Sequence, residues 1–193
     1  MIKNFFLVVF LLSGSSVYAQ FTIEVNWKQV APGSAGDSIY YDPYKKLVWS
    51  DFRGKPDQSN PAAAITESGF GYKMSMQSLN KRTNVQVVVF CYFNKKKSWV
   101  KKGMANNYAL THEQHHFDVT YINAALFVEK LQKAKFNSKN FNELVNDIYD
   151  ECFNALSKMQ NDYDGQTSNG RIREMQLFWN KKIDQQLETL PID

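Results

Sequence analysis

The chain has 193 residues, of which 44% are hydrophobic and 15% aromatic, with a formal net charge of +4. This composition excludes an intrinsically disordered chain, and the length suits one domain with its own hydrophobic core. The small positive charge and the lack of a nucleic-acid-binding motif argue against a nucleic-acid partner. The one dense basic stretch, residues 94–102, is predicted to be a solvated loop rather than a patch for anionic polymers or lipid surfaces.

The first 19 residues have the features of a secretory signal peptide. Lys3 supplies the positive charge, residues 5–12 form an apolar run, and Val17 and Ala19 are the small residues that signal peptidase reads. The apolar run is shorter than the roughly 20 residues of a membrane-spanning helix, and no second run of that length follows. We therefore expect an exported protein, periplasmic or secreted, with one domain over residues 20–193 and no transmembrane anchor after cleavage.

Strands are expected in the first half of the mature chain and helices in the second. The expected strands are residues 21–27, a short stretch ending near Trp49, residues 64–77 and residues 84–93. From residue 106 the apolar spacing becomes helical, which predicts a long helix over residues 108–133. Two further helices are expected, one with Ser138 as its N-cap and one after the turn region near Gly170. This order predicts an α+β fold.

Two cysteines, Cys91 and Cys152, lie in the mature chain. Export would permit a disulfide between them if the strand carrying Cys91 packs against the helix carrying Cys152. The other interpretation is two buried thiols that behave as small apolar side chains. Neither cysteine belongs to a cluster with metal-ligand spacing.

All three histidines of the chain lie in the sequence His112-Glu113-Gln114-His115-His116. On a helix each residue turns by about 100°, so His112 and His116 lie one turn apart on the same face, where two imidazoles can share one cation. Two imidazoles leave open positions on a zinc ion, and a water held there has its pKa lowered to about 7. Glu113 can take the proton of that water, as in the H-E-x-x-H arrangement of zinc metallopeptidases. His115 points about 100° away from His116 and is a poor ligand. The other interpretation is three histidines of the surface or core without a metal.

The chain resembles a bacterial family of exported proteins of formerly unknown function that are described as predicted secreted zinc-dependent proteases, within the zincin-like peptidases. The resemblance includes HEQHHFD at residues 112–118 and extends over residues 47–72, 91–99 and 163–183. It implies a zincin-like fold, in which a small N-terminal sheet precedes the active-site helix and two further long helices. It also implies that the segment 64–77 is an edge strand beside that helix, to which an extended protein or peptide substrate can add as a further strand.

The resemblance implies that His112 and His116 bind Zn²⁺ and that Glu113 is the general base. Asp118 points about 160° away from His116, so we expect it to support helix packing rather than bind the metal. The family motif Y-D-x-x-T-x-H-G corresponds to residues 163–170, where Asn169 stands in place of the expected histidine.

The third zinc ligand therefore stays open from sequence. An amide oxygen such as that of Asn169 is a poor zinc ligand, because zinc prefers imidazole, thiolate and carboxylate. The other candidates are carboxylates from the same turn or from the second long helix: Asp164, Asp147, Asp150 and Glu151.

Two functions follow from these observations. The first is an exported zinc-dependent hydrolase, a peptidase that uses zinc-activated water, and the intact Glu113 favours it. The second is a zincin-like binding or inhibitory module of the cell envelope that has lost catalysis, and Asn169 favours that one.

Overall fold

A four-stranded sheet built around β5 (Arg82–Asn94) forms one layer of the molecule. The computed structural model describes residues 20–27 and 36–190. Antiparallel to β5 run β4 (Ser68–Leu79) and the short β2 (Ser38–Tyr40), while β1 (Gln20–Trp27) pairs with β5 in parallel. A second sheet joins β3 (Ala64–Ile65) to β6 (Trp99–Val100). Among the strands described, β4 pairs with β5 alone and is therefore an edge strand.

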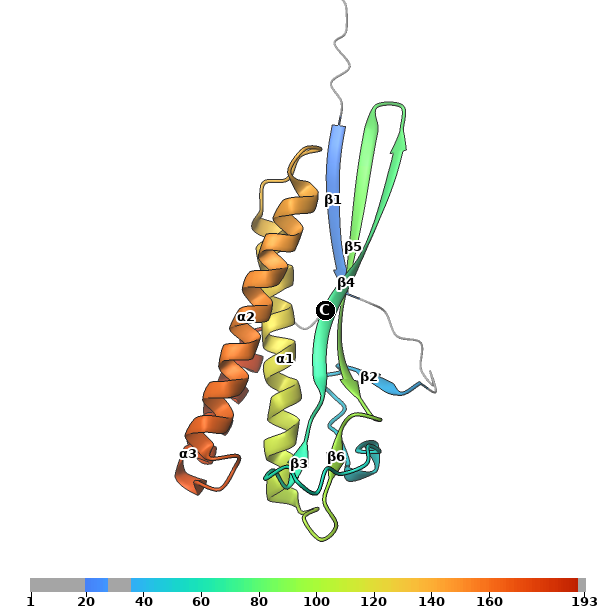
Figure 1. Ribbon diagram of the computed structural model, residues 1–193. Helices are drawn as coiled ribbons and strands as arrows, with labels where there is room; N and C mark the ends of the chain where they lie inside the picture. The colour runs from blue at the N-terminus through green and yellow to red at the C-terminus, as the bar shows by residue number, and fades with distance from the viewer. Residues whose placement is uncertain (1–19, 28–35, 191–193) are drawn as a thin grey trace, which may run out of the picture.

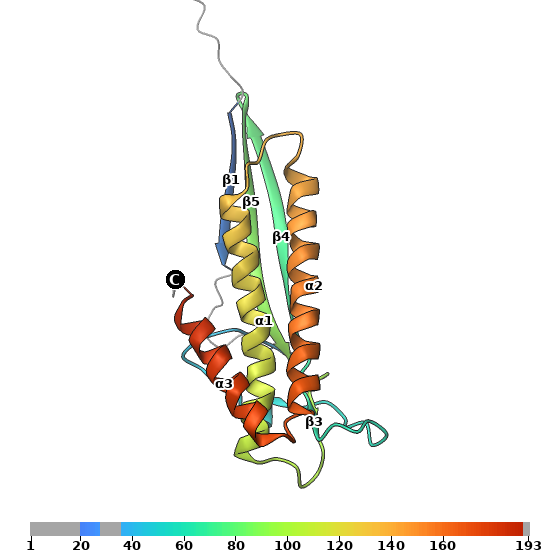
Figure 2. The ribbon, with the colours of Figure 1, turned by 90° about the vertical axis from the view of Figure 1, so that its left-hand side faces the viewer.

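Helices form the second layer. Figures 1 and 2 show α1 (Asn107–Lys133) and α2 (Phe141–Thr167) side by side and antiparallel on one face of the sheet, with α3 (Arg173–Glu188) packed beside α1. The structure is therefore α+β, as the order of the predicted elements indicated. No helix within the described ranges is long and apolar enough to cross a membrane.

The core lies between the sheet and the helices because the side chains of β5 alternate between the two faces of the sheet. Val85, Val87 and Val89 are fully buried on the helix side. From β4, Phe70 points to the same side, where its ring lies 5.9 Å from the ring of Phe127 in α1. These residues belong to one continuous hydrophobic cluster that includes all three helices.

Gly69 and Gly71, two glycines inside β4, have a packing role. A Cβ atom at Gly69 would lie 3.0 Å from the hydroxyl of Tyr92, and one at Gly71 would lie 3.1 Å from the ring of Phe90. The aromatic rings of β5 thus lie directly over the two glycines. The strand tolerates glycine here because the neighbouring rings fill the space of the missing side chains.

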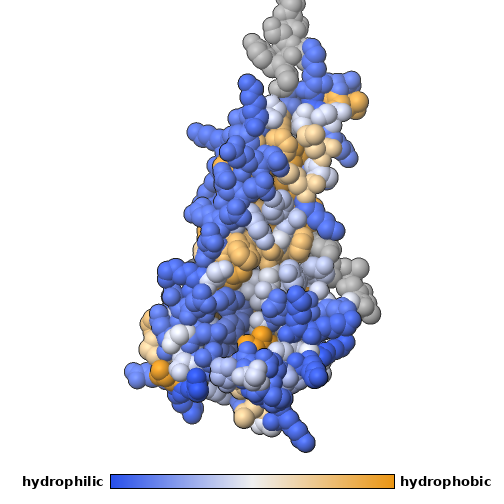
Figure 3. All heavy atoms as spheres, viewed as in Figure 1, coloured by the Kyte–Doolittle hydropathy of each residue, from blue (hydrophilic) through white to orange (hydrophobic). Residues whose placement is uncertain are grey.

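The surface differs between the two ends of the molecule. Figure 3 shows apolar side chains along the seam between the helices and the strands toward the upper end, where Met76 and Leu79 of the β4–β5 hairpin are exposed. Hydrophilic side chains cover most of the lower end, which carries β3 and the start of α1. The predicted histidine site lies at this lower end, where Met104, Leu177 and Phe178 are nevertheless exposed.

Several sequence predictions need correction or fall outside the described ranges. The short strand predicted to end near Trp49 is wrong, because residues 49–51 form a 3₁₀ turn. Ser138 is not the N-cap of α2, which begins at Phe141 after a turn held by the Asn137 side chain, an acceptor for the backbone N–H of Asn140. The predicted signal peptide at residues 1–19 lies outside the described residues.

Cys91 and Cys152 are both buried free thiols, so the interpretation as small apolar side chains is the one that the structure supports. Burial raises the pKa of Cys91 well above its usual value and that of Cys152 to about 11, which keeps both sulfurs protonated at neutral pH.

Candidate metal centre

The first turns of α1 carry the histidine cluster. The Asn106 side chain accepts a hydrogen bond from the backbone N–H of Ala109 and caps the helix, so that His112 and His116 follow in the next turns. Both imidazoles are buried, and their Nε2 atoms lie only 3.2 Å apart. The spacing of four residues on the helix therefore brings the two Nε2 atoms close enough to bind one cation.

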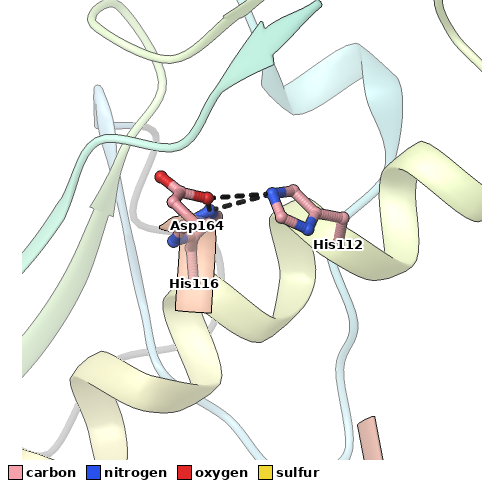
Figure 4. Close-up of side chains that lie close together, drawn as sticks. All are labelled: His112, His116 and Asp164. Atoms are coloured by element: carbon pink, nitrogen blue, oxygen red, sulfur yellow. Dashed lines mark hydrogen bonds and ion pairs between the residues drawn. The ribbon is translucent and has the colours of Figure 1, made fainter. Parts of the chain in front are cut away.

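Asp164, near the C-terminal end of α2, completes the group. Because α2 runs antiparallel to α1, its last turns lie beside the first turns of α1 (Figure 2). The Asp164 Oδ1 atom lies 3.2 Å from Nε2 of His112 and 3.0 Å from Nε2 of His116 (Figure 4). These three residues form a group that could hold a metal ion.

The geometry of this group fits a tetrahedral cation. An ion with bonds of about 2.0–2.1 Å holds its ligand atoms about 3.3 Å apart, close to the 3.0 to 3.2 Å separations observed here. Asp164 Oδ1 is fully buried, yet within the described residues it has no hydrogen bond of ordinary geometry. Two imidazoles and a carboxylate are also a donor set that zinc accepts, with its fourth position left open.

Without a metal ion, a proton on His116 compensates the charge of the Asp164 carboxylate. Burial acts to raise the pKa of Asp164, but the imidazoles of His112 and His116 hold it well below its usual value. Burial likewise acts to lower the pKa of His116, but Asp164, Glu113 and Gln160 together raise it to about 9. A metal ion that binds here therefore displaces a proton.

The Nδ1 atoms of His112 and His116 each contact a glutamine. His112 Nδ1 lies 2.8 Å from Oε1 of Gln176 in α3, and His116 Nδ1 bonds Oε1 of Gln160 in α2. Neither glutamine can be identified from the sequence, because an amide on a helix has no motif that marks such a contact.

Glu113 lies beside the group and is held from the sheet side. The hydroxyl of Thr66, between β3 and β4, donates a 2.7 Å hydrogen bond to Oε2 of Glu113. Glu113 is buried but lines a cavity of about 380 Å³ together with His112 and His116. The segment of residues 62–68 and the turn of residues 169–171 form other parts of the cavity wall. A molecule in this cavity can therefore reach both the group of His112, His116 and Asp164 and the Glu113 carboxylate.

Asn169, named from sequence as a possible ligand, lines the same cavity but is exposed. Together with Ser168 and Gly170 it forms three successive residues of positive φ. Its backbone N–H donates to the Asp164 carbonyl, 2.8 Å away. The turn that contains Asn169 thus folds back onto the residue whose carboxylate joins the histidines.

The other candidate carboxylates of α2 lie closer to its N-terminal end. Asp147, Asp150 and Glu151 are exposed, and Glu151 pairs with Lys130 at 2.9 Å. They precede Asp164 by 13 residues or more, about 20 Å along a helix. None of them belongs to the group.

Tyr163 supports His112 rather than facing the cavity. The tyrosine is fully buried, and its ring stacks on His112 with the ring centroids 4.7 Å apart. Its hydroxyl donates to the carbonyl of His112 and accepts from Gln176. Tyr163 therefore supports the position of His112 and does not offer its hydroxyl to a molecule in the cavity.

Asp118 is fully buried on the opposite side of α1. Its carboxylate accepts hydrogen bonds of 2.8 Å from Tyr41 and from Gln114, and it contacts His115 at 3.1 Å. The expectation that Asp118 supports packing agrees with these contacts. They join α1 to the segment after β2 and give His115 a partner away from the metal group.

Comparisons with family models, curated proteins and solved structures find no match to this chain. The site itself offers three converging atoms that could bind a metal ion, with a carboxylate beside them at the wall of a cavity.

Proposed function

We propose that this chain is an exported zinc-dependent hydrolase, a peptidase of the zincin-like type. The observation that carries the proposal is the convergence of His112 Nε2, His116 Nε2 and Asp164 Oδ1 within 3.2 Å of one another, with Glu113 at the wall of the same cavity. Two imidazoles and a carboxylate match the ligand set of zinc peptidases with an acidic third ligand.

The proposed roles follow from where the side chains lie. His112, His116 and Asp164 hold the ion, and bound zinc supplies a Lewis acid that lowers the pKa of a coordinated water to about 7. Glu113 accepts the proton of the attacking water and later returns it to the leaving group. Thr66 donates to Oε2 of Glu113, which keeps that carboxylate turned toward the cavity and leaves its other oxygen for the proton.

A peptide substrate is proposed because the cavity wall includes an extended segment. Residues 62–68 line the cavity and lead into β4, whose outer edge has no partner strand among the residues described. An extended peptide can lie along such a segment with its backbone near the metal group. This supports the substrate-binding role expected for the strand from Ala64.

Asp164 also favours the hydrolase over the binding or inhibitory module. The second function was inferred from Asn169 standing where a histidine ligand was expected. A carboxylate from the same stretch supplies a third donor of a kind that zinc prefers. The departure at Asn169 then no longer argues for a lost metal site.

Chelation tests the proposed activity. The mature protein should cleave an unstructured protein such as casein, or a mixed peptide library, and lose that activity after dialysis against a chelator. Added zinc should restore it, because the ligands lie together in the folded chain. Activity that survives complete zinc removal would contradict a zinc-dependent hydrolase.

Export is proposed from the first 19 residues. Cleavage after Ala19 should give a mature protein that begins at Gln20. The intact mass of the protein recovered from the periplasm or medium of an expressing bacterium measures this directly. A retained Met1 in that fraction would contradict the predicted cleavage.

A further inference from the structure

We infer that Gln160 and Gln176 are positioning residues that fix the tautomers of the two metal-binding histidines. Each glutamine holds a proton on Nδ1 of one imidazole, so that the lone pair of Nε2 faces the metal. The inference rests on the proposed zinc-dependent function, but it concerns the opposite edge of each ring.

Gln176 cannot turn its amide around without losing two hydrogen bonds. Its Nε2 atom donates to the Tyr163 hydroxyl and to Oδ1 of Asn180, each at 2.6 Å. This leaves Oε1, an acceptor only, 2.8 Å from Nδ1 of His112. Because Gln176 is fully buried, bulk solvent does not compete for this contact. Nδ1 of His112 must therefore be the donor.

Gln160 is oriented in the same way from α2. Its Nε2 atom donates to the backbone carbonyl of His116 at 2.9 Å and to the Thr120 hydroxyl at 3.3 Å. Its Oε1 atom consequently faces Nδ1 of His116. The imidazoles of His112 and His116 are thus each held by an amide from a different helix.

The position of the Nδ1 protons decides which atoms His112 and His116 offer to a metal ion. A neutral imidazole with its proton on Nδ1 carries its lone pair on Nε2. Two such lone pairs then meet Asp164 Oδ1, with the three atoms 3.0 to 3.2 Å apart. Three acceptors that converge in this way repel one another unless a proton or a metal ion lies between them.

The neutrality of both amides has a second consequence. A carboxylate in place of the glutamine would accept the Nδ1 proton more strongly and make the imidazole a better electron donor to the metal. A neutral amide orients the ring without adding negative charge. We expect this choice to leave the metal a stronger Lewis acid at some cost in affinity.

Four substitutions test the inference. Gln160→Met and Gln176→Met remove the acceptor at similar volume, and each should weaken zinc binding by about 10- to 100-fold. Gln160→Glu and Gln176→Glu keep an acceptor for Nδ1 but lose the amide donor, and each should bind zinc more tightly than the methionine variant at the same position while hydrolysing substrate more slowly than the parent. Gln185→Met, at an exposed position of α3, is the matched control and should change neither quantity.

Two further measurements separate positioning from simple loss of structure. The melting temperature of each metal-free variant shows whether the fold is intact, and affinities are compared only between folded variants. If a methionine variant fails to fold, ¹⁵N NMR of the imidazoles in the zinc-loaded parent protein decides: a proton on Nδ1 and the metal on Nε2 support the inference. Unchanged zinc affinity in folded methionine variants, or metal on Nδ1, would overturn it.

Failure of the proposed function would look different. If the parent binds no zinc, the hydrolase proposal falls, while ¹⁵N spectra of the metal-free protein at alkaline pH, where the imidazoles are neutral, still report the tautomers. A proton on Nδ1 of both histidines supports the role of the glutamines, and a proton on Nε2 overturns it.

Discussion

Replacing Glu113 by glutamine is expected to lower hydrolysis by about a hundredfold or more, because an amide cannot accept the proton of the attacking water. Zinc should stay bound, since Glu113 does not belong to the group of His112, His116 and Asp164. The substitution should leave the fold intact as well, because the glutamine carbonyl can still accept the hydrogen bond of Thr66. Turnover of a peptide substrate, measured with zinc content, reports both results.

Glu129→Gln is the control for this substitution. It makes the same change of charge on the same helix, at a position where the carboxylate pairs with Lys133 on the surface. Its turnover should equal that of the parent. If Glu113→Gln also turned over substrate at the parental rate, the general-base role would be wrong even with zinc in place.

Asp164→Asn is expected to weaken zinc binding by about a hundredfold or more. The ligands of a structural zinc site share a binding free energy of about 10–16 kcal/mol, so that one ligand of four accounts for roughly 3 kcal/mol. An amide oxygen restores little of this energy, because it lacks the charge that zinc prefers. Competition with a chromophoric chelator measures the affinity.

Two controls surround this position. Asp162→Asn removes a carboxylate of equal exposure two residues away, one that pairs with Lys158 instead of the histidines. Asn169→Ala removes the side chain that the sequence offered as a ligand. Both variants should bind zinc like the parent. Weaker binding in Asn169→Ala together with unchanged binding in Asp164→Asn would assign the third ligand to Asn169.

Local periodicity explains what the sequence predicted well. A spacing of four residues on a helix places two side chains on one face whatever the rest of the fold does, and α1 starts within one residue of its predicted start. The run of β-branched and aromatic residues at 84–93 likewise predicted β5. Both patterns extend over enough residues to outweigh local exceptions.

Short local signals were less reliable. The apolar residues before Trp49 suggested a strand, but the chain there turns toward α1, where the backbone N–H of Leu47 donates to Gln114. Ser138 has the chemistry of an N-cap, yet hydrogen bonds around Asn137 and Asn140 form a turn that delays the helix. In each case a tertiary contact or a competing side chain decides the outcome.

The third donor depended on how two helices pack. Asp164 lies 48 residues after His116, and only the antiparallel register of α2 against α1 brings its carboxylate to the imidazoles. The sequence left it among several candidates for that reason. Gln160 and Gln176 follow the same rule, because their contacts exist only once all three helices are packed.

The most direct test of a zinc centre is the metal content of the mature protein, purified without chelators and then loaded with zinc and freed of excess. Elemental mass spectrometry should find about one zinc per chain, because the three converging ligand atoms define one tetrahedral site. The double variant His112→Ala, His116→Ala, treated in the same way, should retain almost none. A folded parent protein that holds no more zinc than this variant would contradict the metal centre and the hydrolase proposed from it.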